Sequence, residues 1–165
     1  MMKVAIYPGT FDPFTQGHLR CVERAAKLFD QVVVAVAQGA HKLPLIAYPE
    51  RCRLATQVCA SIPTVRVVPM NGLLVDLAQA LGAGFVVRGL RNCADFENEL
   101  QQVDLNQQMA PDIETVLIAT EPHLRAISAS RVREIARLGK NVTQWVPQPV
   151  AEYLAESSIY GPFDY

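Results

Sequence analysis

A T-x-G-H motif, formed by Thr15, Gly17 and His18, stands where the first helix of the chain is expected to begin. A helix N-terminus attracts anions, because it presents free backbone N–H groups and a partial positive charge. Gly17 would let a ligand approach the backbone closely, and His18 would direct a ring nitrogen at the same anion. The motif therefore predicts a phosphate site. The alternative is a histidine that only packs in the core or caps the helix. Asp12, earlier in the same loop, could fix that loop as an Asx-type turn.

Polar and glycine-containing stretches also follow the other strand-like segments. In parallel sheets, ligands bind beyond the carboxyl ends of the strands. Because glycine, threonine, histidine, lysine, arginine and serine would meet at one such edge, we expect a polyphosphate site there. The stretches lie at residues 39–42, 71–74, 88–91 and 121–130.

Two kinds of apolar spacing alternate along the chain. Short apolar runs rich in β-branched residues predict buried strands, at residues 4–7, 32–37, 65–68, 85–87 and 115–119. Apolar residues three and four apart predict amphipathic helices, at residues 17–29, 49–61, 73–81, 94–109 and 130–138, with a last short helix after Pro149.

This alternation predicts an α/β fold. Parallel strands need crossover helices, and right-handed crossovers place those helices on both faces of the sheet. We expect an open, doubly wound, Rossmann-like sheet of five parallel strands with flanking helices. The length of 165 residues predicts one domain over residues 1–165, with an irregular tail at 157–165.

The composition excludes several classes of protein. With 50% hydrophobic and 19% charged residues, the chain can build a core. The formal net charge of −1 provides no field for gripping long nucleic acid. The four cysteines match no zinc spacing or disulfide framework, and no stretch approaches the roughly 20 apolar residues of a membrane helix. We expect a cytoplasmic protein with reduced thiols, which binds neither nucleic acid nor membrane.

Arginine supplies 11 of the 15 cations. Its planar guanidinium suits bidentate contacts with phosphate. We expect Arg88 and Arg91 to lie with Lys42 and His18 at the functional edge of the sheet. We expect five other arginines to lie on helix faces as solvated partners of acidic residues: Arg20, Arg24, Arg51, Arg53 and Arg137.

Residues Gly9 to His18 read G-T-F-D-P-F-T-Q-G-H, which resembles the signature of the phosphopantetheine adenylyltransferases, nucleotidyltransferases that carry T-x-G-H or H-x-G-H. The resemblance extends from residue 4 to about 147. Neither G-x-G-x-x-G nor G-x-x-x-x-G-K-[ST] occurs in the first loop, which argues against a dinucleotide dehydrogenase or a P-loop ATPase. Four later segments match the family in order: Lys42, Gly72–Asp76, Arg88–Glu99 and Ile127–Arg133.

The resemblance implies reversible transfer of the adenylyl group of ATP to phosphopantetheine, which gives dephospho-coenzyme A and pyrophosphate in coenzyme A biosynthesis. The substrate phosphate is itself the nucleophile, so catalysis would consist mainly of positioning and electrostatic stabilisation. We expect Mg²⁺ to arrive with ATP, bound mainly through its phosphates, and no protein metal cage. The resemblance also implies a homohexamer, and it makes coenzyme A a plausible inhibitor.

Matching positions imply roles for individual residues. His18 would contact the α-phosphate, and Thr10 would lie between the two substrates. Residues implied as catalytic are His18, Thr10, Lys42, Arg88 and Arg91. Phosphopantetheine would contact Thr10, Lys42, Leu74 and Arg88. ATP would contact Thr10, Phe11, His18, Gly89, Leu90, Arg91, Glu99, Leu124, Arg125, Ala126, Ile127, Ser128, Ala129 and Ser130.

Several of these residues have structural alternatives. A serine within residues 128–130 could cap the following helix. Arg91, Asp95 and Glu99 stand four apart and could form helical ion pairs. Leu74 could belong to the core.

Three other functions compete with the implied one. A nicotinate mononucleotide adenylyltransferase or a cytidylyltransferase usually has histidine at the position of Thr15 and lacks R-G-L-R…D-F-E. A catalytically silent nucleotide-binding module is disfavoured, because the implied catalytic residues are all present. An RNA-binding domain is the weakest, because the chain lacks a basic stripe with interleaved aromatic residues.

Overall fold

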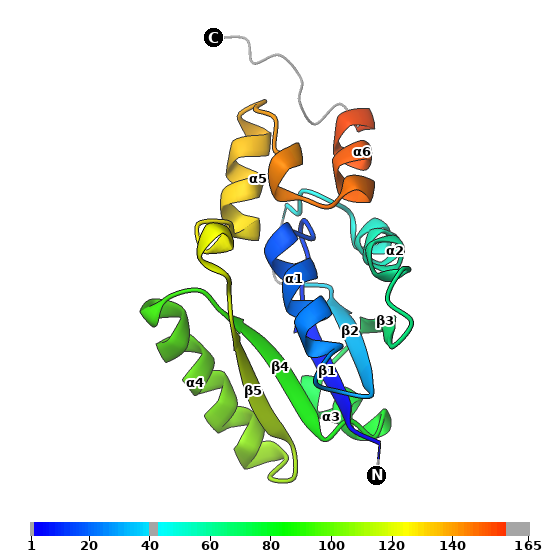
Figure 1. The fold of residues 1–165 in the computed structure, drawn as a ribbon, viewed down its shortest axis with the longest axis vertical. Helices are drawn as coiled ribbons and strands as arrows, with labels where there is room; N and C mark the ends of the chain where they lie inside the picture. Colours follow the sequence, from blue (N-terminus) through cyan, green and yellow to red (C-terminus); the bar gives the residue numbers. More distant parts are fainter. Residues whose placement is uncertain (1, 40–42, 158–165) are drawn as a thin grey trace.

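A computed structural model describes residues 2–39 and 43–157 (Figure 1). Strands and helices alternate in the predicted order. The strands are β1 Val4–Gly9, β2 Gln31–Ala37, β3 Val65–Met70, β4 Phe85–Leu90 and β5 Glu114–Ala119. The helices are α1 Gln16–Ala25, α2 Tyr48–Cys59, α3 Leu74–Ala80, α4 Cys93–Met109, α5 Ala129–Arg137 and α6 Gln148–Glu156, with 3-10 turns η1 Pro122–Leu124 and η2 Thr143–Trp145.

The five strands form one parallel sheet in the order β3-β2-β1-β4-β5. The chain builds outward from β1 to β3, returns to the other side of β1, and continues outward through β4 and β5. The predicted open, doubly wound sheet is therefore confirmed. The strand order reverses between β1 and β4, and a reversal of this kind opens a crevice at the carboxyl ends of the strands.

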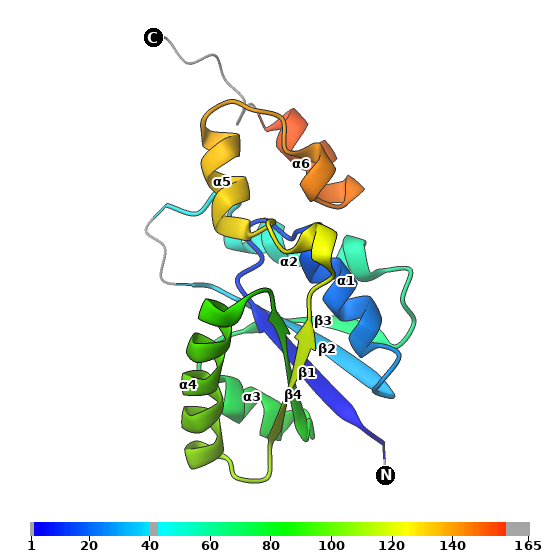
Figure 2. The ribbon, with the colours of Figure 1, turned by 60° about the vertical axis from the view of Figure 1, so that its left-hand side comes forward.

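Alternate residues of the central strands pack on opposite faces of the sheet. Ala5 and Val34 belong to a core shared with α1, α2, α5 and α6. Ile6 and Val33 belong to a second core that includes Val75 of α3. Because both faces are covered, β1 and β2 are almost continuously buried, as expected for inner parallel strands. Figures 1 and 2 show α5 and α6 beyond the carboxyl end of the sheet.

Several boundaries differ from the apolar spacing, and β1 and β3 each extend two residues beyond their predicted ends. β4 continues past residue 87, because Gly89 and Leu90 still pair with β5, opposite Ile118 and Ala119. The first helix ends at Ala25 rather than at residue 29. Phe29 is nevertheless 8% exposed and packs in the core, since a turn buries it as well as a helix would.

The predicted helix ends at two glycines are confirmed. Gly82 and Gly139 have φ angles of +64° and +70°, which glycine adopts at little cost. In the described ranges, no helix combines the length and apolar character needed to cross a membrane. Most of the tail predicted at 157–165 lies outside the described residues.

Candidate functional site

A cleft of about 300 Å³ opens at the carboxyl ends of β1 and β4. This is the edge at which the polar loops were predicted to meet. The loop after β1, the start of α1, the end of β4, α4 and the start of α5 all contribute to its walls. The lining residues are Tyr7–Phe11, Thr15, Gly17, His18, Cys21, Arg88, Gly89, Arg91, Asp95, Glu99, Thr120, Ile127–Ser130 and Arg133.

Most of the predicted site residues line this cleft. They are Thr10, Phe11, His18, Arg88, Gly89, Arg91, Glu99, Ile127, Ser128, Ala129 and Ser130. Five others do not line it: Leu74, Leu90, Leu124, Arg125 and Ala126. Leu74 packs against the second core, Leu124 is buried, and Arg125 donates to the carbonyl of Thr120 at 3.2 Å. Lys42 lies outside the described residues.

His18 caps α1 and lines the cleft at the same time. Its Nδ1 accepts a hydrogen bond from the backbone N–H of Thr15 at 2.9 Å, and its own N–H donates to the Thr15 hydroxyl at 3.3 Å. Its ring meets Phe11 and Phe14 edge-on, with centroids 5.1 and 5.5 Å away. His18 therefore caps the helix, as the structural alternative proposed, and this contact does not exclude a role at the cleft.

The protonation state of His18 follows from these contacts. Burial, with the nearby positive charges of Arg91 and Arg88, lowers the pKa of His18 from 6.5 to about 4. The imidazole is therefore neutral at physiological pH. Because Nδ1 accepts a hydrogen bond, Nε2 carries the single ring proton. His18 thus provides a neutral hydrogen-bond donor at a fixed orientation.

Buried side chains from other elements hold the loop between β1 and α1. The Asp12 carboxylate, 1% exposed, accepts from the N–H groups of Leu45 and Ile46 at 2.9 and 2.8 Å. Asp12 therefore anchors a distant segment, not an Asx-type turn of its own loop. Arg133 of α5 donates to the Asp12 carbonyl at 2.7 Å and to the Ser130 hydroxyl at 3.1 Å.

The expected pairing of five helix-face arginines with acidic residues is wrong for three of them, of which Arg51 is buried, Arg24 half-buried and Arg137 exposed. Arg51 is 2% exposed and donates to backbone carbonyls, as do Arg24 and Arg137. Arg20 and Arg53 pair with glutamates, as predicted. Helical spacing could not reveal this difference, because it does not show which loops cross a helix face.

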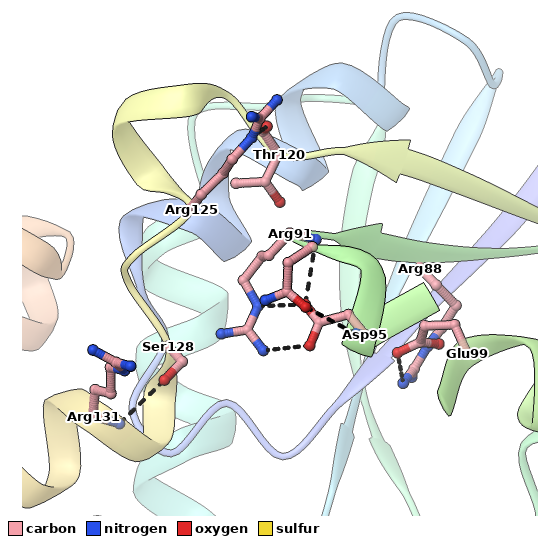
Figure 3. Close-up of polar contacts among 9 residues, drawn as sticks. Arg88, Arg91, Asp95, Glu99, Thr120, Arg125, Ser128 and Arg131 are labelled. Atoms are coloured by element: carbon pink, nitrogen blue, oxygen red, sulfur yellow. Dashed lines mark hydrogen bonds and ion pairs between the residues drawn. The ribbon is translucent and has the colours of Figure 1, made fainter. Parts of the chain in front are cut away.

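Two arginine–carboxylate pairs form one wall of the cleft (Figure 3). Arg91 Nε and Nη2 donate to the Asp95 carboxylate at 2.9 and 3.1 Å. Arg88 Nε and Nη2 donate to the Glu99 carboxylate at 2.6 and 2.9 Å. The helical ion-pair alternative is thus confirmed for Arg91 and Asp95, whereas Glu99 pairs with an arginine of β4.

The carboxylates hold both guanidinium groups in place beside the cleft. The Arg88 and Glu99 side chains are only 29% and 15% exposed. Although burial alone lowers it, the pKa of Arg88 is raised overall by its hydrogen bonds to Glu99 and the charge of that carboxylate. Such bidentate pairs fix orientation as well as charge. The cleft therefore has preorganised cations, which suits recognition of phosphate groups.

The start of α5 forms the opposite wall. Ser128 is the N-cap, and its hydroxyl accepts from the N–H of Arg131 at 3.2 Å (Figure 3), so the predicted cap is confirmed at this serine. Ser128, Ala129 and Ser130 all line the cleft. The free N–H groups of this helix start favour an anion.

Some lining residues were given no substrate contact from the sequence, among them Tyr7, Cys21, Thr120 and Arg133. Cys21 follows His18 by three residues, so helical spacing could have placed both on one face of α1. Burial raises the pKa of Cys21 to about 11 and that of Tyr7 well above its usual value. Both groups stay protonated at neutral pH, so Cys21 offers no thiolate nucleophile.

The described residues contain no group of three or more histidine, cysteine and acidic side chains placed to hold a metal ion. The two cleft carboxylates that face arginines, Asp95 and Glu99, are already paired. The arrangement can bind polyanions between cations and a helix start, and the Nε2–H group of His18 can donate a hydrogen bond to them.

A family model for cytidylyltransferase-like proteins matches residues 6–135. A phosphopantetheine adenylyltransferase from Thiobacillus denitrificans is 46% identical over 155 residues, which are 94% of this chain and 97% of the relative. One from Rubrobacter xylanophilus is 48% identical over 163 residues, 99% of this chain and 98% of the relative.

Solved structures share the fold at much lower identity. A bifunctional NMN adenylyltransferase/ADP ribose pyrophosphatase from Francisella tularensis matches with a TM-score of 0.73 at 14% identity, over 97% of this chain and 52% of that one. A Vibrio parahaemolyticus protein assigned as a nicotinate-nucleotide adenylyltransferase matches with a TM-score of 0.72 at 17% identity, over 99% of this chain and 98% of that one. At this identity the likeness concerns the fold alone.

Proposed function

The chain belongs to the phosphopantetheine adenylyltransferases of the cytidylyltransferase-like family, and on that premise we propose that it transfers the adenylyl group of ATP to phosphopantetheine. The products are dephospho-coenzyme A and pyrophosphate, and the transfer is reversible. The observation that carries the proposal is the 43–48% identity to relatives of that name over nearly the whole chain. The cleft adds independent support, because it gathers cations, a helix start and a fixed hydrogen-bond donor.

The reaction needs no nucleophile from the protein. A phosphate oxygen of phosphopantetheine bonds to the α-phosphorus of ATP, the bond between that phosphorus and the bridging oxygen breaks, and pyrophosphate leaves. The main tasks of the protein are to align two anions and to stabilise charge. Alignment of reactants alone can lower a barrier by roughly 7–11 kcal/mol.

We assign the donor role to His18, whose Nε2–H would bond an α-phosphate oxygen. The Thr10 hydroxyl would contact the same phosphate, and Arg88 would bind the phosphate of phosphopantetheine. Arg91 and the start of α5 would bind the polyphosphate of ATP. Lys42 would join Arg88, a role that rests on the sequence resemblance.

The remaining predicted contacts lie outside the cleft lining and also rest on the resemblance. They are the contact of Leu74 with phosphopantetheine and those of Leu90, Leu124, Arg125 and Ala126 with ATP. Leu90 and residues 124–126 border segments that line the cleft, so a bound substrate that extends beyond it would reach them, whereas Leu74 lies on α3, none of whose residues lines it. Coenzyme A, which contains the phosphopantetheine arm, would compete at the same site.

Mg²⁺ would enter with ATP, held by phosphate oxygens and water. The paired state of Asp95 and Glu99 fits this mode of binding, because neither carboxylate is free to form a cage. The ion would neutralise phosphate charge, while the residues of the chain orient the substrates. The reduced cysteines fit an enzyme that acts in the cytoplasm.

We propose a homohexameric assembly. Helix α4 lies on the outside of the sheet in both views (Figures 1 and 2). It exposes Phe96, Leu100, Leu105 and Met109, with 41%, 41%, 52% and 49% of each residue accessible. Several exposed apolar side chains on one helix are typical of a protein interface. Light scattering of the purified protein would measure six subunits, and a monomer would refute the assembly.

One assay tests the function. Purified protein with ATP, Mg²⁺ and phosphopantetheine should release pyrophosphate, and the same mixture with nicotinate mononucleotide should not. Dephospho-coenzyme A with pyrophosphate should yield ATP. Turnover of the mononucleotide without turnover of phosphopantetheine would reject the proposal in favour of a different adenylyltransferase.

A further inference from the structure

Arg51 of α2 is a buried cation whose hydrogen-bond partners, within the described part of the chain, are all backbone carbonyls. Its Nη1 donates to Thr10 at 2.5 Å and to Ala37 at 2.8 Å. Its Nη2 donates to Gln38 at 2.8 Å, and its Nε to Ile46 at 3.1 Å. One guanidinium thus holds the loop after β1, the end of β2 and the segment before α2.

A buried arginine at position 51 costs folding free energy, and a requirement for fixed carbonyl positions would explain its presence. A buried charge loses its hydration, and an apolar side chain would fill the same space more cheaply. Tyr48 holds Arg51 in turn: its ring lies 5.3 Å from the guanidinium carbon, and its hydroxyl donates to the carbonyl of Val36 at 3.1 Å. Arg51 is therefore fixed against the end of β2 and can hold the bonded carbonyls in constant positions.

Among the residues whose carbonyls Arg51 holds, Thr10 lines the cleft. Arg51 holds its carbonyl on one side. On the other side lies Gly39, where an added Cβ would come within 2.9 Å of the Thr10 methyl carbon. Gln38, the residue before that glycine, is bonded to the same guanidinium. Arg51 thus fixes the Thr10 backbone, and Gly39, which lacks a Cβ, leaves room for the Thr10 methyl carbon, so both residues bear on the position of the Thr10 hydroxyl.

We infer that Arg51 is a positioning residue for adenylyl transfer, which orients the Thr10 hydroxyl by fixing the carbonyls of Thr10 and Gln38. Arg51 does not line the cleft, so it would act only through these contacts. The inference rests on the proposed function, because Thr10 faces a reacting phosphate only in that reaction.

The first test compares Arg51→Lys with Arg53→Lys, a control two residues away on the exposed face of α2. A lysine has three donors on one nitrogen and cannot reproduce the four contacts. Arg51→Lys should lower kcat about 10- to 100-fold with both substrates saturating, with smaller changes in KM. Arg53, which pairs with Glu50 at 2.8 Å, should tolerate lysine with unchanged kcat. An unchanged kcat for Arg51→Lys would overturn the inference.

The second test asks whether Arg51 acts through Thr10. Thr10→Val keeps the shape of the side chain and removes the hydroxyl. If Arg51 only orients that hydroxyl, Arg51→Lys should cause no further loss of kcat in the Thr10→Val background. Losses that multiply would show an independent structural effect and would also overturn the inference. Thermal unfolding of each variant confirms that the compared proteins are folded.

A variant at Gly39 covers the case in which Arg51→Lys does not fold. Gly39→Ala leaves Arg51 in place, but it directs a methyl group at the Thr10 methyl carbon and strains the backbone, whose φ there is +77°, so kcat should fall. Thr10→Ser removes that methyl carbon, so Gly39→Ala should cost less kcat in the serine background. Equal losses in both backgrounds would overturn the inference. A wild-type protein without turnover of phosphopantetheine would instead refute the proposed function.

Discussion

His18 and Thr15 are bonded to each other in both directions across the first turn of α1: Nδ1 of His18 accepts from the Thr15 N–H at 2.9 Å, and the Thr15 hydroxyl accepts from the His18 N–H at 3.3 Å. This reciprocal capping box satisfies two donors at the helix start. It also commits Nδ1 as an acceptor, which directs the single proton of the neutral ring to Nε2. A structural contact thereby sets the chemical state of a cleft residue.

We predict that His18→Ala lowers kcat about 100- to 1,000-fold, the usual cost of losing one transition-state donor. KM values should change less, because the donor acts mainly on charge that develops during the transfer. The variant also loses a cap contact, so Thr15→Ala is the matched control, with a stability loss of about 1 kcal/mol and a much smaller loss of kcat. Steady-state pyrophosphate release measures both. Full turnover of His18→Ala would mean that His18 only caps the helix.

The lowered pKa of His18 predicts a pH dependence of stability. The pKa is 6.5 for a free histidine and about 4 here, so the unfolded chain binds more protons than the folded chain between these values. The free energy of unfolding should therefore fall as the pH drops from 6.5 towards 4, by roughly 3 kcal/mol from this group.

Urea unfolding of wild type and His18→Asn across that pH range isolates the contribution, because the acidic residues titrate in both proteins. The difference in stability between the two should shrink as the pH falls. His123→Gln, at a histidine whose side chain is 72% exposed, is a control for histidine removal in general. Parallel pH profiles for wild type and His18→Asn would contradict the lowered pKa of His18.

Arg88→Ala should weaken phosphopantetheine binding about 10- to 100-fold, the cost of one charged hydrogen-bonding partner. Part of that loss would come from Glu99, whose carboxylate remains beside the cleft without its partner at 2.6 Å. The double variant Arg88→Ala/Glu99→Gln should therefore bind better than Arg88→Ala alone. Calorimetric titration with phosphopantetheine measures the affinities. Equal affinities for the single and double variants would exclude this repulsion, and an unchanged affinity for Arg88→Ala would reject its role.

Gly9→Ala should destabilise the fold by about 1–3 kcal/mol, the usual cost of overpacking. An added Cβ would lie 2.9 Å from Cζ of Phe11, and that ring is buried and stacked on Phe14 at 4.8 Å. Gly84→Ala is the control, because a Cβ there meets nothing within 4 Å. Chemical denaturation should find Gly84→Ala close to wild type. A Gly9→Ala protein of wild-type stability would show that the Phe11 ring can move.

Much of the architecture was predictable from local patterns. The apolar runs around Val33 and Val86 predicted strands, because strands that are buried on both faces consist almost entirely of apolar residues. Strict alternation with helices then left few topologies open. Strand ends were less predictable, since Gly89 looks like a loop residue and its pairing with β5 depends on a partner about thirty residues away.

Many of the residues that line the cleft were also predictable from the sequence. The residues of the signature loop and of the Arg88–Arg91 segment met as expected, because carboxyl ends of parallel strands share one edge. The contribution of Cys21 was missed, since a cysteine on an apolar helix face reads as core. The partnership of Glu99 with Arg88 also could not be predicted, because Arg88 lies on β4 and helical spacing relates Glu99 only to residues of its own helix.

By itself, the sequence determined the class of fold, the edge of the sheet that carries the chemistry, and the family, because these depend on periodicity and on contiguous motifs. Only the tertiary structure decided what the charged side chains do there. The sequence suggested a solvated Arg51 and an Asx-type turn at Asp12, yet both side chains are buried and hold backbone groups of distant segments. The physical reason is that a charge can be buried only where polar partners converge on it, and folding alone brings those partners together.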